Sequence, residues 1–355
     1  MKRVGAVCVL CVLVMTMLSA CGSWMSGEYL SVKPYEVRPE QNDQQVIDVA
    51  SYSQLRNVIR DLVADGSAGG LISISSFHEA VVDFYVNSAI NHVKNNTPIG
   101  AYAVKEISYE IGTNRGDSVV AVQIEYLHNR TEIKSIKQVS SNEQMLDAVK
   151  TAMADNESYL VLYIEDYSDV DFADVVSAYG DEHPELIMEI PQVNTFSYPE
   201  RGQERVVEIY FTYQTDSETL QEMQKKVQAV FSSAELYVRQ MTKVMDIYTR
   251  LYSFLMGGSS YKLESSITPA YSLLYHGVGD SRTFANVYAA MCRNADLECQ
   301  VISGTRDGEP WYWNQIRFRG SYYHVDLLRC YEQNEFVIKS DSEMIGYVWG
   351  YSPFS

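Results

Sequence analysis

Basic residues are scarce in this sequence of 355 residues, which has 28 lysines and arginines against 46 aspartates and glutamates. The formal net charge is therefore −18. Nucleic acids and anionic lipid headgroups bind proteins through basic faces, so this charge argues against both as partners.

Cysteine is also scarce, and after Cys21 only Cys292, Cys299 and Cys330 remain. An odd set of thiols does not indicate a disulfide framework. At most one pair closes, and buried free thiols are an equal alternative. The histidines and cysteines form no cluster with metal-ligand spacing, so neither a metal nor another cofactor is expected.

The N-terminus carries a targeting signal. Residues 4–17 are an almost unbroken apolar run behind two basic residues. The run has about the length of a signal-peptide core and is shorter than the roughly 20 residues of a membrane span. Leu18-Ser19-Ala20-Cys21 follows and resembles the bacterial lipobox, in which the cysteine is diacylated and becomes the new N-terminus.

The lipobox resemblance implies a signal peptide at residues 1–20, a lipid on Cys21 and a polar tether at residues 21–45. We therefore expect a lipoprotein, anchored to the bacterial membrane through Cys21 and located on its extracytoplasmic face. The mature chain would have 26 basic and 46 acidic residues, a formal charge of −20. The alternatives are an ordinary signal peptide or an N-terminal transmembrane helix.

An internal repeat follows the tether. Two predicted helices have apolar residues at helical spacing: Leu55, Val58, Ile59, Leu62 and Val63 in one, Met145, Val149 and Met153 in the other. Each is followed by a short apolar strand, a second helical stretch and two strands with alternating apolar residues. We predict a duplicated β-α-β-α-β-β module, with copies at residues 46–133 and 134–214. Such a duplication without a reactive cluster favours binding or spacing over catalysis.

The remaining chain, residues 215–355, is predicted to begin with a long helix over residues 217–256. Residues 268–349 then resemble the transglutaminase-like (papain-type thiol) superfamily. The matching segments include Asp280-Ser281-Arg282-Thr283-Phe284-Ala285, Trp311-Tyr312-Trp313-Asn314 and Tyr322-Tyr323-His324-Val325-Asp326. The resemblance implies a papain-like α+β domain, so the fold class expected for the whole chain is α+β.

The resemblance also identifies three positions that would carry chemistry. The family uses a cysteine thiolate at a helix N-terminus, a histidine base and an orienting aspartate. The corresponding residues here are Ser281, Trp311 and Asp326. A hydroxyl needs a base more than a thiol does, and an indole offers only a donor. The pattern therefore predicts a catalytically inactive member of the family.

Two histidines leave an alternative open. His324 lies two residues before Asp326, and His276 lies five residues before Ser281. Either could serve as the base of a relocated triad with Ser281. For His324, a structural role in a strand is the competing interpretation.

Three functions are consistent with this sequence. In the first, the inactive domain is a binding module for a peptide, a protein or a cell-envelope glycan, with a candidate groove at Trp311, Trp313 and Tyr323. In the second, the chain is a serine-variant transglutaminase-like or peptidase-like enzyme that acts on amide bonds in the cell envelope. In the third, it is an assembly or spacer protein.

Overall fold

The computed structural model describes residues 45–258 and 260–350. Cys21 and the predicted signal peptide lie outside the described residues, as does nearly all of the predicted tether. Among the helices within the described ranges, none combines the length and the hydrophobicity needed to cross a membrane. The chain from Ile47 onward groups into one compact unit.

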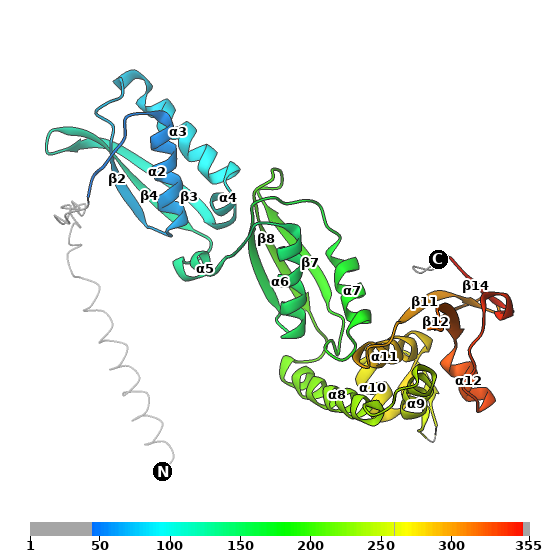
Figure 1. The fold of residues 1–355 in the computed structure, drawn as a ribbon. Coiled ribbons are helices and arrows are strands. Elements are labelled where there is room, and N and C mark those ends of the chain that lie inside the picture. Colours follow the sequence, from blue (N-terminus) through cyan, green and yellow to red (C-terminus); the bar gives the residue numbers. More distant parts are fainter. Residues whose placement is uncertain (1–44, 259, 351–355) are drawn as a thin grey trace, which may run out of the picture. The chain divides into compact units, whose positions relative to one another are not determined.

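The first sheet has four strands in the order β1-β2-β4-β3, with β1 parallel to β2 and the other pairs antiparallel (Figure 1). Helix α2 begins after Ser51, whose hydroxyl accepts a hydrogen bond from the Gln54 amide, and it buries Leu55, Ile59 and Val63 against the sheet. The elements are β1 Ile47–Asp48, α2 Tyr52–Ala64, β2 Gly69–Ser73, α3 Glu79–Asn96, α4 Pro98–Ala103, β3 Val104–Asn114 and β4 Asp117–Tyr126.

The second sheet repeats this topology, with strand order β5-β6-β8-β7 and the same parallel and antiparallel pairs. Its first helix begins after Ser141, which caps the Gln144 amide, and it buries Met145, Val149 and Met153. The elements are α5 Arg130–Ser135, which connects the two sheets, β5 Lys137–Val139, α6 Asn142–Ala154, β6 Tyr159–Ile164, α7 Phe172–Glu182, β7 Gln192–Tyr198 and β8 Arg205–Thr212. The common order is consistent with a duplication, which itself stays a prediction.

A buried carboxylate joins the two sheets. Glu208 of β8 is 4% exposed and accepts hydrogen bonds from the hydroxyls of Tyr159, Tyr198 and Tyr210 at 2.9, 3.1 and 3.1 Å. The Tyr159 hydroxyl also lies 3.2 Å from that of Tyr102, which comes from α4. Because buried polar groups need such partners, this network links the first repeat to the second.

The third sheet has the order β13-β12-β11-β14, and all its pairs are antiparallel. Helix α11 packs on one face with Phe284, Tyr288 and Met291 buried. The elements of this part are α8 Ser217–Val238, α9 Val244–Met256, β9 Lys262–Leu263, α10 Pro269–His276, β10 Val278–Gly279, α11 Ser281–Asn294, β11 Cys299–Arg306, β12 Glu309–Phe318, β13 Ser321–Val325, α12 Leu327–Gln333, η1 Asp341–Glu343 and β14 Tyr347–Trp349. The mixed α+β class is confirmed.

The single long helix expected over residues 217–256 is wrong. The chain forms two helices, α8 and α9, separated at residues 239–243. A continuous helix of this length would extend for about 60 Å. The break instead lets Val227 of α8 and Leu251 of α9 join the same core as Phe284 of α11.

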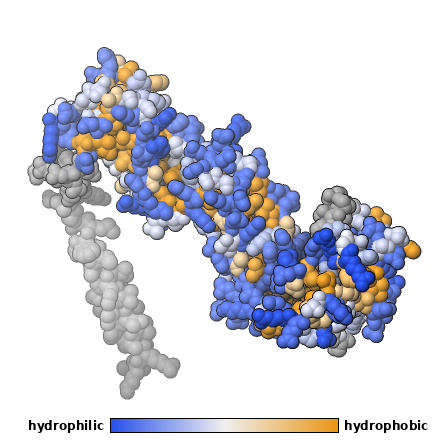
Figure 2. All heavy atoms as spheres, viewed as in Figure 1, coloured by the Kyte–Doolittle hydropathy of each residue, from blue (hydrophilic) through white to orange (hydrophobic). Residues whose placement is uncertain are grey.

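Hydrophilic residues dominate the face of the molecule that Figure 2 shows. On the face seen in Figure 2, hydrophobic residues form separate small areas among hydrophilic ones. Scattered apolar residues are normal on a globular protein.

Candidate active site

Ser281 is the first residue of α11, as predicted from the sequence. Asp280 caps the helix, because its Oδ1 accepts hydrogen bonds from the Thr283 amide at 2.8 Å and the Thr283 hydroxyl at 2.7 Å. The Ser281 Oγ accepts a hydrogen bond from the backbone N–H of Tyr312 on β12 at 3.2 Å. The serine therefore has the helix N-terminus that the chemistry requires, while its oxygen is held by a donor.

Trp311 lies on β12, at the position to which the sequence resemblance assigns the histidine. Its Nε1–H donates to Asp326 Oδ2 at 3.0 Å. This is the hydrogen bond that a histidine would make with an orienting aspartate, but the indole has no basic lone pair to turn toward a hydroxyl. The Arg306 guanidinium lies over the indole ring, 5.0 Å from its centroid. The aspartate contact is therefore kept, and the base is absent from this position.

Asp326 follows β13 directly and is the N-cap of α12, with its Oδ1 accepting the amides of residues 328 and 329. Its Oδ2 accepts from the Tyr347 hydroxyl at 2.7 Å and from Arg306 at 3.3 Å, in addition to Trp311. Burial and the hydrogen bond to Asp326 raise the pKa of Tyr347. Asp326 is 8% exposed, and hydrogen-bond donors surround both oxygens of its carboxylate. The carboxylate therefore holds the side chains around it in place.

The candidate groove at Trp311, Trp313 and Tyr323 does not form as predicted. Trp313 is 1% exposed and packs with Ile302 and Met344, while Tyr323 packs on the other core, which faces α11. Met344, Tyr347 and Trp349 pack against Trp313, and β14 itself extends the sheet as the neighbour of β11. Trp313 is therefore a core residue and cannot contact a ligand.

Both ring nitrogens of His324 contact residues other than Ser281. The Trp313 Nε1–H donates to His324 Nδ1 at 2.9 Å, and His324 Nε2 lies 3.0 Å from Asp341 Oδ1. In the neutral ring, Nδ1 is then the acceptor and Nε2–H the donor. Burial lowers the pKa of His324, although the hydrogen bond to Asp341 opposes this shift. The structural interpretation of this histidine fits the contacts better than the catalytic one.

His276 is the last residue of α10 and is exposed. Its ring lies edge-on to Tyr271, with 5.5 Å between the centroids. Neither histidine is thus hydrogen-bonded to Ser281 in the structure.

The three thiols after Cys21 are free, and two of them are fully buried. Burial raises the pKa of Cys330 to about 11 and that of Cys292 well above its usual value. A reactive thiol needs a lowered pKa, so these two do not replace the missing nucleophile. Within the described residues, no three histidine, cysteine, aspartate or glutamate side chains come together as a metal site.

The start of α11 is also tied to the second repeat. Arg282 Nε donates to Asp181 Oδ2 of α7 at 3.1 Å, and Asn286 Nδ2 donates to Asp181 Oδ1 at 2.8 Å. The Arg282 guanidinium also lies 5.6 Å from the Tyr312 ring centroid. The residue next to Ser281 is therefore engaged by an element that lies about a hundred residues earlier in the chain.

Sequence reasoning missed several contacts of this site. The partners Arg306 and Tyr347 of Asp326 lie on β11 and β14, and the Asp181 contact comes from the other part of the chain. Asn314, which is fully buried, donates to the Ala285 carbonyl of α11 at 2.9 Å. Of these residues, only Asn314 could have been identified from the local sequence, since it lies within the matched Trp-Tyr-Trp-Asn segment.

The family comparison agrees with this geometry. The model of the transglutaminase-like superfamily matches residues 233–327, a range that includes Ser281, Trp311 and Asp326. The chain therefore contains a transglutaminase-like domain. No curated protein matches the chain.

Several solved structures align with parts of the chain. A TGase aligns over 58% of this chain and 61% of its own at 10% identity, with a TM-score of 0.27. A candidate cysteine protease from Cytophaga hutchinsonii aligns over 46% and 71% at 13% identity, with a TM-score of 0.25. A candidate protease from Parabacteroides distasonis aligns over 64% and 38% at 8% identity, with a TM-score of 0.23. The chain thus spans 61% of the TGase, and these low scores add nothing to the family match.

Proposed function

We propose that this protein is a membrane-anchored, extracytoplasmic lipoprotein whose transglutaminase-like domain is catalytically inactive and binds a peptide, a protein or a cell-envelope glycan. The main support is the hydrogen bond from Trp311 Nε1 to Asp326. An indole in the histidine position cannot take a proton from Ser281, and the serine oxygen already accepts the Tyr312 amide. A transglutaminase-like scaffold without a base beside Ser281 is suited to binding.

Absence of turnover is the first expected result. The mature protein, purified in detergent, should neither hydrolyse nor crosslink glutamine-containing and lysine-containing peptides above the rate of a Ser281→Ala variant. Ammonia release and mass spectrometry of the peptides would measure this. Turnover that disappears in Ser281→Ala would instead support the serine-enzyme alternative, and His276→Gln and His324→Gln would then identify its base.

The anchor can be tested separately, because it depends on the lipobox-like residues 18–21 alone. Mass spectrometry of protein extracted from membranes should find a diacylated Cys21 as the N-terminus. Cys21→Ser should abolish acylation and leave an unprocessed or mislocalised precursor. An N-terminus other than lipidated Cys21 in the wild-type protein would contradict the proposal.

A further inference from the structure

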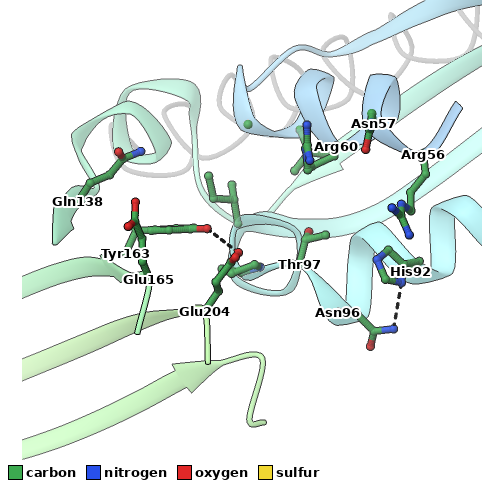
Figure 3. A pocket seen from close by; sticks show the side chains of 14 residues that line it. Arg56, Asn57, Arg60, His92, Asn96, Thr97, Gln138, Tyr163, Glu165 and Glu204 are labelled. Atoms are coloured by element: carbon green, nitrogen blue, oxygen red, sulfur yellow. Dashed lines mark hydrogen bonds between the residues drawn. The ribbon is translucent and has the colours of Figure 1, made fainter. Parts of the chain in front are cut away.

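A pocket of about 440 Å³ lies between helices α2, α3 and α4 on one side and the second sheet with its connections on the other (Figure 3). Its volume is within the range of roughly 300–1,000 Å³ that is usual for small-molecule sites. Apolar side chains form part of its lining, namely Val63, Pro98 and Ile99. The link between Tyr102, Tyr159 and Glu208 joins the same two parts of the chain and supports this arrangement.

Charged residues of opposite sign line this pocket. Arg56 and Arg60 come from α2, whereas Glu165 and Glu204 come from the second sheet and its connections, at the other side of the view in Figure 3. Arg60 pairs with its own neighbour Asp61. Among residues 45–258 and 260–350, no ion pair joins these arginines to these glutamates, and Arg56 has no carboxylate partner.

The polar neighbours keep these charges available to a ligand. The Tyr163 hydroxyl donates to Glu204 Oε2 at 2.8 Å, which orients the carboxylate and leaves Oε1 open. At the arginine side, Asn96 Nδ2 lies 3.4 Å from His92 Nδ1. Burial, and secondarily the charge of Arg56, lowers the pKa of His92, so the imidazole adds no positive charge at neutral pH. Arg56 therefore supplies the positive charge for a ligand on the α2 side of the pocket.

We propose that this pocket binds a short peptide with free ends, whose carboxylate pairs with Arg56 and whose ammonium group pairs with Glu204. A simple anion or cation would satisfy one side and leave the other uncompensated. A single amino acid has both charges on one carbon, whereas an extended tripeptide spans about 10 Å and can reach from α2 toward the connection before β8. A small apolar side chain fits against Ile99.

This site is independent of the transglutaminase-like domain and of the function proposed for it. No residue of the pocket belongs to the sheet that carries Trp311. A Ser281→Ala variant should therefore bind the peptide as the wild type does, and loss of one proposal leaves the other standing.

Calorimetric titration of the mature protein in detergent with trialanine tests the idea. Trialanine with free ends should bind, and both its N-acetyl and its C-terminal amide forms should bind roughly tenfold more weakly or worse, because each lacks one charged hydrogen bond. Free alanine should also bind more weakly. Equal binding of free and blocked peptides, or no binding of trialanine, overturns the proposal.

Two variants assign the ends of the peptide. Arg56→Gln should bind the free peptide and its amide with equal affinity, since the partner of the carboxylate is gone. Glu204→Gln keeps an acceptor for Tyr163 and should cease to distinguish the free peptide from its N-acetyl form. The matched controls Glu235→Gln, at an exposed position of α8, and Arg239→Gln, at the exposed residue directly after α8, should retain both preferences. If Arg56→Gln still distinguished the free peptide from its amide, or Glu204→Gln still distinguished it from its N-acetyl form, the assignment of the peptide's ends would be refuted.

Discussion

Asp326→Ala is expected to destabilise the C-terminal domain by about 3–5 kcal/mol. The substitution leaves the half-buried Arg306 without its buried carboxylate partner, removes the acceptor of Trp311 and Tyr347, and uncaps α12. Denaturant unfolding followed by tryptophan fluorescence measures the effect, since Trp311, Trp313 and Trp349 all lie in this part.

Glu332 provides the matched control for this prediction. It pairs with the same arginine at 3.2 Å, but its side chain is 50% exposed, so Glu332→Ala should change the free energy of unfolding by less than about 1 kcal/mol. Asp326→Asn should be intermediate, because it keeps a capping oxygen and loses the charge. Equal stability of Asp326→Ala and wild type would contradict a structural role for this carboxylate.

Restoring two residues is expected to restore a reactive nucleophile. In Ser281→Cys with Trp311→His, the thiol lies at the start of α11 and the imidazole at the position that now contacts Asp326. A helix N-terminus and a neighbouring imidazole together lower a thiol pKa from about 8.5 into the range of about 3.5–7.5. At pH 6.5 the double variant should therefore react with iodoacetamide about tenfold faster than Ser281→Cys alone.

The decisive control is Ser281→Cys with Trp311→Ala, which opens similar space without a base. If the alanine variant reacts with iodoacetamide as fast as the histidine variant, steric access explains the higher rate. The proposal that the domain places a histidine next to the thiol is then refuted. The wild-type protein provides the background from Cys299, since Cys292 and Cys330 are buried.

Local patterns in the sequence were sufficient for the main elements of the site. The resemblance, which assigned Ser281 to a helix N-terminus, predicted the helix start, and the matched segments gave the strands that carry Trp311 and the end at Asp326. Alternation correctly placed Trp311 and Trp313 on one face of β12, because side chains in a strand have a period of two. These are relations within a few residues of chain.

What the sequence could not predict depends on contacts over long distances. Alternation does not reveal that β14 returns to pair with β11 and packs Tyr347 and Trp349 against Trp313. Gly304 permits this pairing, because a Cβ there would lie 2.2 Å from the Val348 carbonyl oxygen. The pairing of His324 with Asp341 likewise depends on a segment beyond α12. For the same reason, helical periodicity did not reveal the break between α8 and α9, which packing around α11 determines.

The contact of Asp181 with Arg282 and Asn286 limits how the gene for this protein can be divided by recombination. The transglutaminase-like domain shares its core with Met188, which is fully buried and precedes β7. A gene fragment that begins after the second repeat would therefore encode a domain with an exposed apolar surface and an unpaired arginine beside Ser281. Shuffling among genes should then move residues 137–212 and this domain together.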